Sequence, residues 1–147
     1  DAIQAIRDFA AGIYPPLLGA EGLVVALSQD AKRAALPVEV DGDGVGRYPR
    51  DIESAVYFAI LEALQNTAKY ADASRAWVQL GERNGDLWFE VHDNGSGFDT
   101  THAGRGVGLN GIADRLDTIG GTWTITSTPG HGTVVAGAVP VRESARF

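Results

Sequence analysis

A group of polar residues lies at helical spacing near the middle of the chain. Glu62, Asn66 and Lys69 are separated by four and then three positions, which places them on one face of a helix. An amide oxygen is a good ligand for Mg²⁺, which takes the rest of its shell from waters and phosphates. Asn66 therefore suits a metal ligand, Lys69 a phosphate contact, and Glu62 the polarisation of a water or the support of a metal shell. A solvated charged face would explain Glu62 and Lys69, but not the asparagine at the edge of an apolar stripe.

A second candidate is the turn Asp93-Asn94-Gly95-Ser96-Gly97, which follows an alternating, strand-like run. A carboxylate accepts hydrogen bonds, so Asp93 has the chemistry to read the exocyclic amine of adenine. The glycines would let a ligand lie against bare backbone. The alternative is an Asx-turn that only closes the strand.

The third candidate is the glycine-rich run Gly104-Arg105-Gly106-Val107-Gly108-Leu109. Residues 106–111 spell GxGxxG, but no strand precedes them and no acidic residue follows at the spacing that a dinucleotide fold needs. Small residues that lead into a helix still make an anion site, because the first N–H groups of the helix are unpaired. The alternative is a surface loop that the glycines merely shape.

The elements that must position these residues can be read from the apolar pattern. A helix is predicted over 51–71, and its buried stripe of Ile52, Val56, Ala59 and Ala63 leads to Asn66. Two Pro residues end a first helical segment, 3–13, and a second amphipathic helix is predicted over 20–35. The remaining predictions are strands at 36–40, 76–80, 87–91, 122–128 and 133–141, a hairpin turn at Asn84-Gly85, and a helix over 109–119 that Gly120-Gly121 closes. This order predicts an α/β two-layer sandwich, a mixed sheet with helices on one face.

Composition limits the class of protein. A length of 147 residues suits one domain, and 12 basic against 19 acidic residues give a net charge of -7, which argues against nucleic acid as a partner. There is no Cys, no long apolar run and no signal-peptide pattern, so we expect a cytoplasmic location. The first residue is Asp1, and we expect the chain to be a piece of a longer protein. More than half of the 19 glycines lie between residues 95 and 137, where the backbone must approach something closely.

Four stretches, taken in order, resemble the boxes of one ATPase family. Residues 62–71 resemble the N box, 93–97 the G1 box and 104–109 the G2 box, and 130–133 is similar to the last glycine box of the fold shared by gyrase B, Hsp90, histidine kinases and MutL. This is the GHKL, or Bergerat, ATP-binding fold. Within that family, Gly111-Ile112-Ala113-Asp114-Arg115-Leu116 resembles the nitrate- and degradation-type sensor histidine kinases, the NarL-partner subfamily.

The opening of the chain is similar to the segment where the dimerisation helix of these kinases passes into the catalytic domain. The resemblance thus implies two parts. Residues 1–18 would be the end of a dimerisation and phosphoacceptor helix with its linker, and residues 19–147 would be the ATP-binding catalytic domain.

The resemblance also implies roles for individual residues. Asn66 would bind Mg²⁺, Asp93 would read adenine, and Thr133 would support the Asp93 end of the pocket. Tyr70 stands where the family usually has His, although its hydroxyl can still donate to phosphate. The short lid over 100–105 would cover ATP poorly, so we expect weak affinity. The remaining implied ATP contacts are Lys69, which would meet a phosphate, Gly95 and Gly97 at the base, and Gly104, Arg105, Gly106, Val107, Gly108 and Leu109 around the phosphates and lid hinge.

The implied activity is transfer of the γ-phosphoryl of MgATP to a histidine on the protein's own dimerisation domain, for relay to a response regulator. Glu62 and Asn66 would be the catalytic residues, and the full-length protein would be a homodimer. Two alternatives share the same pocket. One is an anti-sigma-factor serine kinase, and the other is a nucleotide-sensing module with weak or no catalysis.

Overall fold

The structure is a computed structural model that describes residues 15–34, 36–70, 72–96, 109–127 and 129–141. For residues 68–70 and 109–110 it describes the backbone and not the side chains. Within these ranges, no helix is both long and apolar enough to cross a bilayer.

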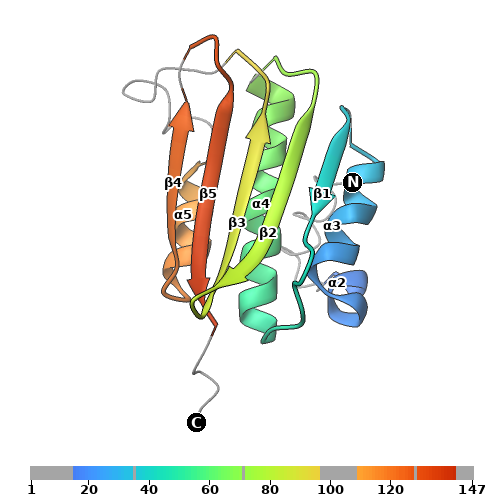
Figure 1. Cartoon of the computed structure of the whole chain (residues 1–147), viewed down its shortest axis with the longest axis vertical. Coiled ribbons are helices and arrows are strands. Elements are labelled where there is room, and N and C mark those ends of the chain that lie inside the picture. The colour runs from blue at the N-terminus through green and yellow to red at the C-terminus, as the bar shows by residue number, and fades with distance from the viewer. Residues whose placement is uncertain (1–14, 35, 71, 97–108, 128, 142–147) are drawn as a thin grey trace.

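A five-stranded mixed sheet forms one layer of the molecule (Figure 1). The strand order is β1-β2-β3-β5-β4, and only β1 and β2 run parallel to each other among these neighbours. The bounds are β1 Val38–Asp41, β2 Ala76–Arg83, β3 Asp86–Asp93, β4 Thr122–Ser127 and β5 Thr133–Pro140. Asn84 and Gly85 connect β2 to β3 with φ of 57° and 83°, the pair of positive values that a tight type I′ hairpin needs.

The helices cover one face of this sheet, as the alternating pattern predicts (Figure 1). They are α2 Pro16–Glu21, α3 Leu23–Lys32, α4 Arg50–Tyr70 and α5 Leu109–Asp117. α4 packs on β2 and β3 and also contacts α2, α3 and α5. The predicted two-layer α/β sandwich is therefore confirmed, and α4 is the element on which the core is built.

The buried surface of α4 is wider than the predicted stripe. Ile52, Val56, Ala59 and Ala63 are buried as expected, but every residue from 55 to 61 is buried as well. A helix that touches only a sheet hides one face, whereas α4 has the sheet beneath it and helices beside it. The strands, by contrast, begin within two residues of the predicted runs, although β2 continues to Arg83, beyond the predicted end at residue 80.

The N-terminal part of the description corrects one prediction. A single helix over 20–35 was expected, and the structure instead has two short helices separated by Gly22, whose φ is 94°. Pro16 is the first residue of α2. Proline is tolerated there because the N–H groups of the first helical turn have no acceptor within the helix, so the missing N–H breaks no hydrogen bond. Leu18 of α2 is fully buried, so this segment is part of the core.

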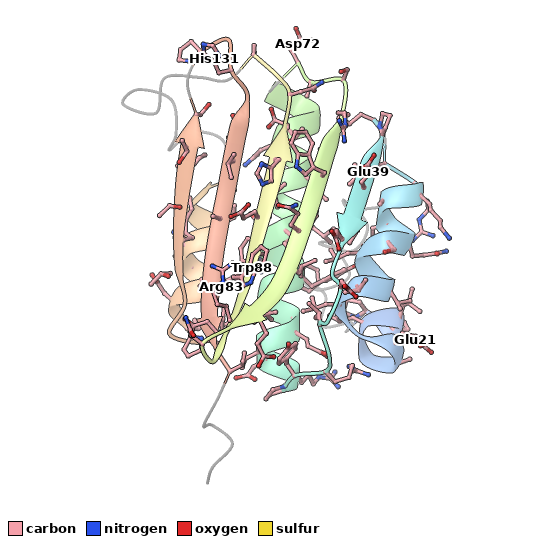
Figure 2. All side chains as sticks on the ribbon, viewed as in Figure 1. Glu21, Glu39, Asp72, Arg83, Trp88 and His131 are labelled. Carbon is pink, nitrogen blue, oxygen red and sulfur yellow. The ribbon has the colours of Figure 1, made fainter. Side chains whose placement is uncertain are left out.

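The sheet face opposite the helices carries half-buried aromatic side chains (Figure 2). Trp77 stacks on His92 with ring centroids 5.1 Å apart, and the Arg83 guanidinium lies 5.1 Å from the Trp88 ring centroid. These contacts pack both tryptophan rings against neighbouring side chains. Across the register, Asp93 at the end of β3 lies opposite both Ala76 and Thr133.

Candidate functional site

Asp93 ends β3 with a carboxylate that is only 8% exposed. Its Oδ1 accepts a hydrogen bond of 2.8 Å from the Gly95 backbone N–H, and its Oδ2 accepts one of 3.2 Å from the Thr67 hydroxyl. The first contact is the Asx-turn that the sequence left open as an alternative, and the second ties the carboxylate to α4. A carboxylate has about four acceptor positions, so two bonds leave capacity for a further donor.

Thr67 is a site residue that the sequence analysis missed. It is buried, and its hydroxyl lies 3.2 Å from the Ala63 carbonyl oxygen as well as from Asp93. The signal for it is in the spacing of the stripe. Continuing from Ala63 by four positions reaches Thr67, whereas continuing by three reaches Asn66.

Asn66 sits beside Thr67 on α4, and its amide nitrogen Nδ2 is buried without a hydrogen-bond partner among the described residues. A buried polar group that lacks a partner costs about 1–3 kcal/mol, so such groups are rare and need an explanation. A side chain that binds a ligand has a polar atom whose partner is on the ligand and not on the protein. The Asn66 Nδ2 atom, at the edge of a buried helix face, has this property among the described residues. The amide thus fits a ligand that supplies the missing partner.

Glu62 lies one turn before Asn66 and is held by α5. Its Oε1 accepts a hydrogen bond of 2.6 Å from Arg115 Nε, and both side chains are mostly buried. Gly111, one turn before Arg115, leaves the space that the carboxylate fills, because a Cβ on Gly111 would lie 2.2 Å from Glu62 Oε2. Neither the Arg115 contact nor the role of Gly111 was predicted.

Thr133 is buried opposite Asp93, and its hydroxyl shares a hydrogen bond of 2.8 Å with Ser127 Oγ. The preceding Gly132 has a φ of 80°, and a Cβ there would lie 2.4 Å from the Asp93 carbonyl oxygen. On the other side, the Asn94 side chain accepts hydrogen bonds from the Ser74 and Arg75 backbone N–H groups. The neighbouring loops therefore fix the backbone on either side of Asp93.

The structure thus brings Asn66, Asp93, Gly95 and Thr133 to one end of α4 and β3, with Glu62 a turn away along α4. Lys69, Tyr70 and Leu109 belong to helices, but their side chains are not described. Among residues 15–34, 36–70, 72–96, 109–127 and 129–141, no group of three or more metal-binding side chains of the His, Asp and Glu type comes together. The other predicted contacts lie outside the described residues, namely Gly97, Gly104, Arg105, Gly106, Val107 and Gly108.

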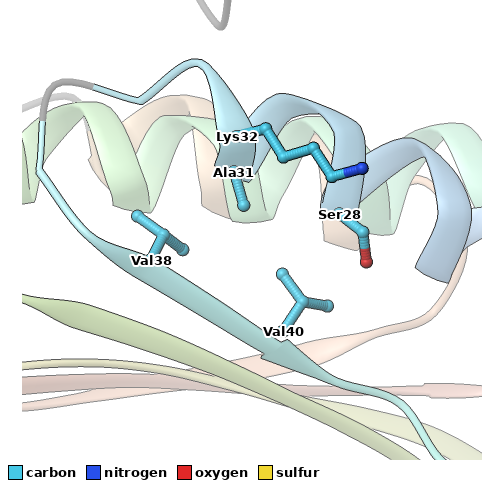
Figure 3. A pocket seen from close by; sticks show the side chains of 5 residues that line it. All are labelled: Ser28, Ala31, Lys32, Val38 and Val40. Atoms are coloured by element: carbon cyan, nitrogen blue, oxygen red, sulfur yellow. The ribbon is translucent and has the colours of Figure 1, made fainter.

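A cavity of about 220 Å³ lies elsewhere, between α3 and β1 (Figure 3). No predicted site residue lines it. Its walls are mainly aliphatic, and Lys32 contributes the one charged side chain among the lining residues Ser28, Ala31, Lys32, Val38 and Val40.

Comparison with known proteins gives relatives among sensor kinases. The chain is 35% identical over 96 residues to the signal transduction histidine-protein kinase/phosphatase DegS of Brevibacillus brevis, covering 65% of this chain and 25% of that protein. It is 31% identical over 122 residues to the sensor histidine kinase LiaS of Bacillus subtilis, covering 82% of this chain and 34% of that protein. The chain therefore spans about a quarter to a third of the length of these curated relatives.

Solved structures share the fold. The Erythrobacter litoralis EL346 blue-light activated histidine kinase matches with a TM-score of 0.69 at 22% identity, over 85% of this chain and 43% of that one. The ATP-binding domain of PrrB from Mycobacterium tuberculosis matches with a TM-score of 0.64 at 22% identity, over 82% of this chain and 92% of that one.

A family model settles the relationship. It matches residues 51–143, the range that begins with α4 and includes the Asp93 turn and the end of β5. The chain therefore belongs to the family of histidine kinase-, DNA gyrase B- and HSP90-like ATPases.

Proposed function

We propose that this chain is the ATP-binding catalytic domain of a bacterial sensor histidine kinase of the nitrate- and degradation-sensor type. Its reaction is transfer of the γ-phosphoryl group of MgATP to a histidine that another part of the protein supplies. The family match over 51–143 and the two sensor-kinase relatives support this assignment.

The observation that carries the proposal is the polar end of α4. A buried carboxylate with spare acceptor capacity, Asp93, is tied by Thr67 to the same helix turn that carries the unpartnered amide of Asn66. Asp93 accepts a hydrogen bond from the adenine amine, and Gly95 holds the carboxylate in place from its own backbone N–H. Thr133 and Gly132 keep the facing strand close to this position.

The phosphates lie, in this proposal, between α4 and the segment that leads into α5. Lys69 and Tyr70, in the last turn of α4, would contact the phosphates. The other residues proposed to lie around the phosphates and the lid hinge are Gly97, Gly104, Arg105, Gly106, Val107, Gly108 and Leu109. The Asn66 amide oxygen suits Mg²⁺ because it is a hard ligand. The amide nitrogen Nδ2, which has no partner among the described residues, can donate to a phosphate oxygen. Bound there, Mg²⁺ would neutralise charge on the phosphates.

The whole protein has further partners in this proposal. Residues 1–18 hold the end of its dimerisation and phosphoacceptor helix with the linker, and residues 19–147 form the catalytic domain. The end of that linker is the start of α2, where Leu18 is buried in the core. The parent protein is a homodimer that passes the phosphoryl group to a response regulator. The domain works in the cytoplasm, where ATP is available. With a net charge of -7, nucleic acid is not a partner.

Substituting Asn66→Ala tests the site and the activity together. We expect magnesium-dependent binding of an ATP analogue to weaken by at least about tenfold, which is about 1.4 kcal/mol. Thermal stability should not fall by more than about 0.5 kcal/mol, since the lost amide nitrogen has no partner to abandon. The neighbouring Gln65→Ala is the matched control on the same helix and should bind as the wild type does.

The activity itself is measured on a longer protein that includes the proposed dimerisation helices, incubated with γ-labelled ATP and Mg²⁺. The expected product is an acid-labile phosphohistidine outside residues 1–147, formed by the wild type and Gln65→Ala and strongly reduced in Asn66→Ala. If the wild type binds the analogue but labels no histidine, the chain is a nucleotide-sensing module. If the wild type does not bind the analogue at all, the assignment of the site is wrong.

A further inference from the structure

A mostly buried ion pair joins the two helices that flank the proposed phosphate region. Arg115 Nε of α5 donates to Glu62 Oε1 of α4 at 2.6 Å, with side-chain exposures of 23% and 16%. Guanidinium–carboxylate bonds of this length are about twice as strong as neutral hydrogen bonds, and low exposure protects them from salt and solvent. The two helices lie side by side on the sheet (Figure 1).

The surroundings are built to hold the Glu62 carboxylate. Gly111 and Arg115 are one turn apart on α5, and both lie against this carboxylate. Arg115 supplies the positive charge, and Gly111 leaves the space that the carboxylate fills. A Cβ on Gly111 would lie 2.2 Å and 2.7 Å from the two carboxylate oxygens. The Arg115 guanidinium also lies 5.4 Å from the ring centroid of Phe58, a fully buried residue one turn before Glu62.

The position of this pair along both helices gives it a consequence for the site. On α4, Glu62 lies one turn before Asn66, and on α5, Arg115 lies in the helix that begins at Leu109, the last residue of the glycine-rich run. An ion pair between them fixes α5 relative to the turn of α4 that carries Asn66. Ile112 and Leu116, on the inner side of α5, are buried in the core. Apolar packing is non-directional, so it fixes the position of a helix along its neighbour less strictly than a charged hydrogen bond does.

The geometry points to Arg115 as a positioning residue that acts through Glu62 to hold α5 in register with Asn66 for ATP. Glu62 is then a strut between helices, with its carboxylate turned to Arg115 and Gly111, and is not the base that activates the phosphoryl acceptor. This inference rests on the proposed function, because it concerns binding of ATP at the same site.

Two substitutions separate a strut from a base. Arg115→Ala breaks the ion pair and leaves the Glu62 carboxylate in place, whereas Glu62→Gln keeps an oxygen acceptor for Arg115 and removes any base. For a strut, Arg115→Ala weakens binding of a fluorescent ATP analogue by about tenfold and raises KM for ATP in the longer protein, while Glu62→Gln loses less than about threefold in either measurement. For a base, the order reverses, and Glu62→Gln loses kcat while Arg115→Ala retains it.

A control variant shows whether weaker binding could come from a general loss of stability. Arg47→Ala breaks another arginine–carboxylate pair on α4, far along the helix from Asn66, and should leave the affinity of the folded protein for the analogue unchanged. Arg115→Lys, which keeps a positive charge, should recover part of the binding that Arg115→Ala loses. All variants are compared at a temperature where circular dichroism shows each to be fully folded.

The outcomes separate the proposed function from the positioning role of Arg115. If the wild type does not bind the analogue, the proposed function fails. If the wild type binds and folded Arg115→Ala binds equally well, or if Glu62→Gln is the more damaging substitution, then Arg115 is not a positioning residue and this inference is overturned.

Discussion

The two ends of α4 both bury polar groups, and they differ in how completely those groups are paired. Near the N-terminal end, Glu53 is 1% exposed and accepts hydrogen bonds from Arg47 Nε at 2.9 Å, Arg47 Nη2 at 3.1 Å and the Tyr48 backbone N–H at 3.1 Å. Near the C-terminal end, Asn66 has a buried amide nitrogen without a partner in the described part of the chain. The complete set of partners of Glu53 indicates a structural role, and the incomplete set of Asn66 fits the ligand-binding role proposed for it.

The paired end has an evident structural purpose. Besides Glu53, Arg47 donates to the backbone carbonyls of Leu18, Gly19 and Ala20, which belong to α2. The Leu18 carbonyl also accepts from the Gly22 backbone N–H. Because the last carbonyls of a helix lack a full following turn of donors, a guanidinium that reaches several of them caps the helix. Arg47 thereby joins α2 to the start of α4. The Glu53 carboxylate has all its hydrogen bonds from the protein and needs none from a ligand.

The largest effect on stability should come from breaking this paired end. Arg47→Ala leaves the Glu53 carboxylate buried without its cation and removes the cap of α2, so we expect a loss of about 3 kcal/mol in the free energy of unfolding, measured by urea titration. Arg33→Ala is the control, since Arg33 makes one hydrogen bond of 3.3 Å to Asp30, and that carboxylate keeps the Tyr57 hydroxyl as a donor, so the pair should be worth no more than about 0.5 kcal/mol. Equal losses in the two variants would contradict the structural reading of the Glu53 pair.

An intermediate effect is expected at the other end, and it should appear in binding more than in stability. Thr67→Val keeps the side-chain shape but removes the hydroxyl that donates to Asp93, so we expect about tenfold weaker binding of an ATP analogue, about 1.4 kcal/mol. The free energy of unfolding should change by about 1 kcal/mol or less.

Thr126→Val, on the exposed side of β4, is the matched control for Thr67→Val and should change neither quantity. If Thr67→Val destabilised the protein as strongly as Arg47→Ala and left the affinity intact, the two ends of α4 would have the same structural role. The distinction between paired and unpaired polar groups would then fail.

The smallest effect is a change of stability at alkaline pH near the paired end. Partial burial, together with the 2.7 Å hydrogen bond to Glu82, raises the pKa of Tyr48 from 10.0 to about 12. A pKa that is higher in the folded state contributes stability that is complete below about pH 10 and is lost as the pH rises to about 12. Tyr48→Phe should therefore show a smaller fall in unfolding free energy between pH 9 and pH 12, as measured by urea titration.

A second tyrosine gives the reference for that measurement. Burial and the hydrogen bond to Asp30 also raise the pKa of Tyr57, so part of the alkaline fall should persist in Tyr48→Phe. An alkaline profile identical to that of the wild type would show that Tyr48 contributes nothing to it.

Much of the fold was predictable because its signals are local. The helix predicted over 51–71 is α4 at 50–70, and the Asn84-Gly85 turn joins two strands whose alternation is plain in the sequence. The two short helices around Gly22 were not predicted, because the separation depends on a single residue with positive φ inside an otherwise continuous apolar pattern. Pro16 opens α2, which was not predicted, and the segment 3–13 that Pro15 and Pro16 were predicted to end lies outside the described residues.

The candidate site divides in the same way. Residue type and spacing by themselves determined Asn66 and Asp93 as candidates, because a helical face and a strand end can be read along the chain. Only the tertiary structure decided that Thr67 donates a hydrogen bond to Asp93 and that Arg115 donates one to Glu62. These contacts join residues that are 26 and 53 positions apart in the sequence. Periodicity reports which side of an element is buried, but the partner that a buried polar group meets is set by the packing of distant elements against it.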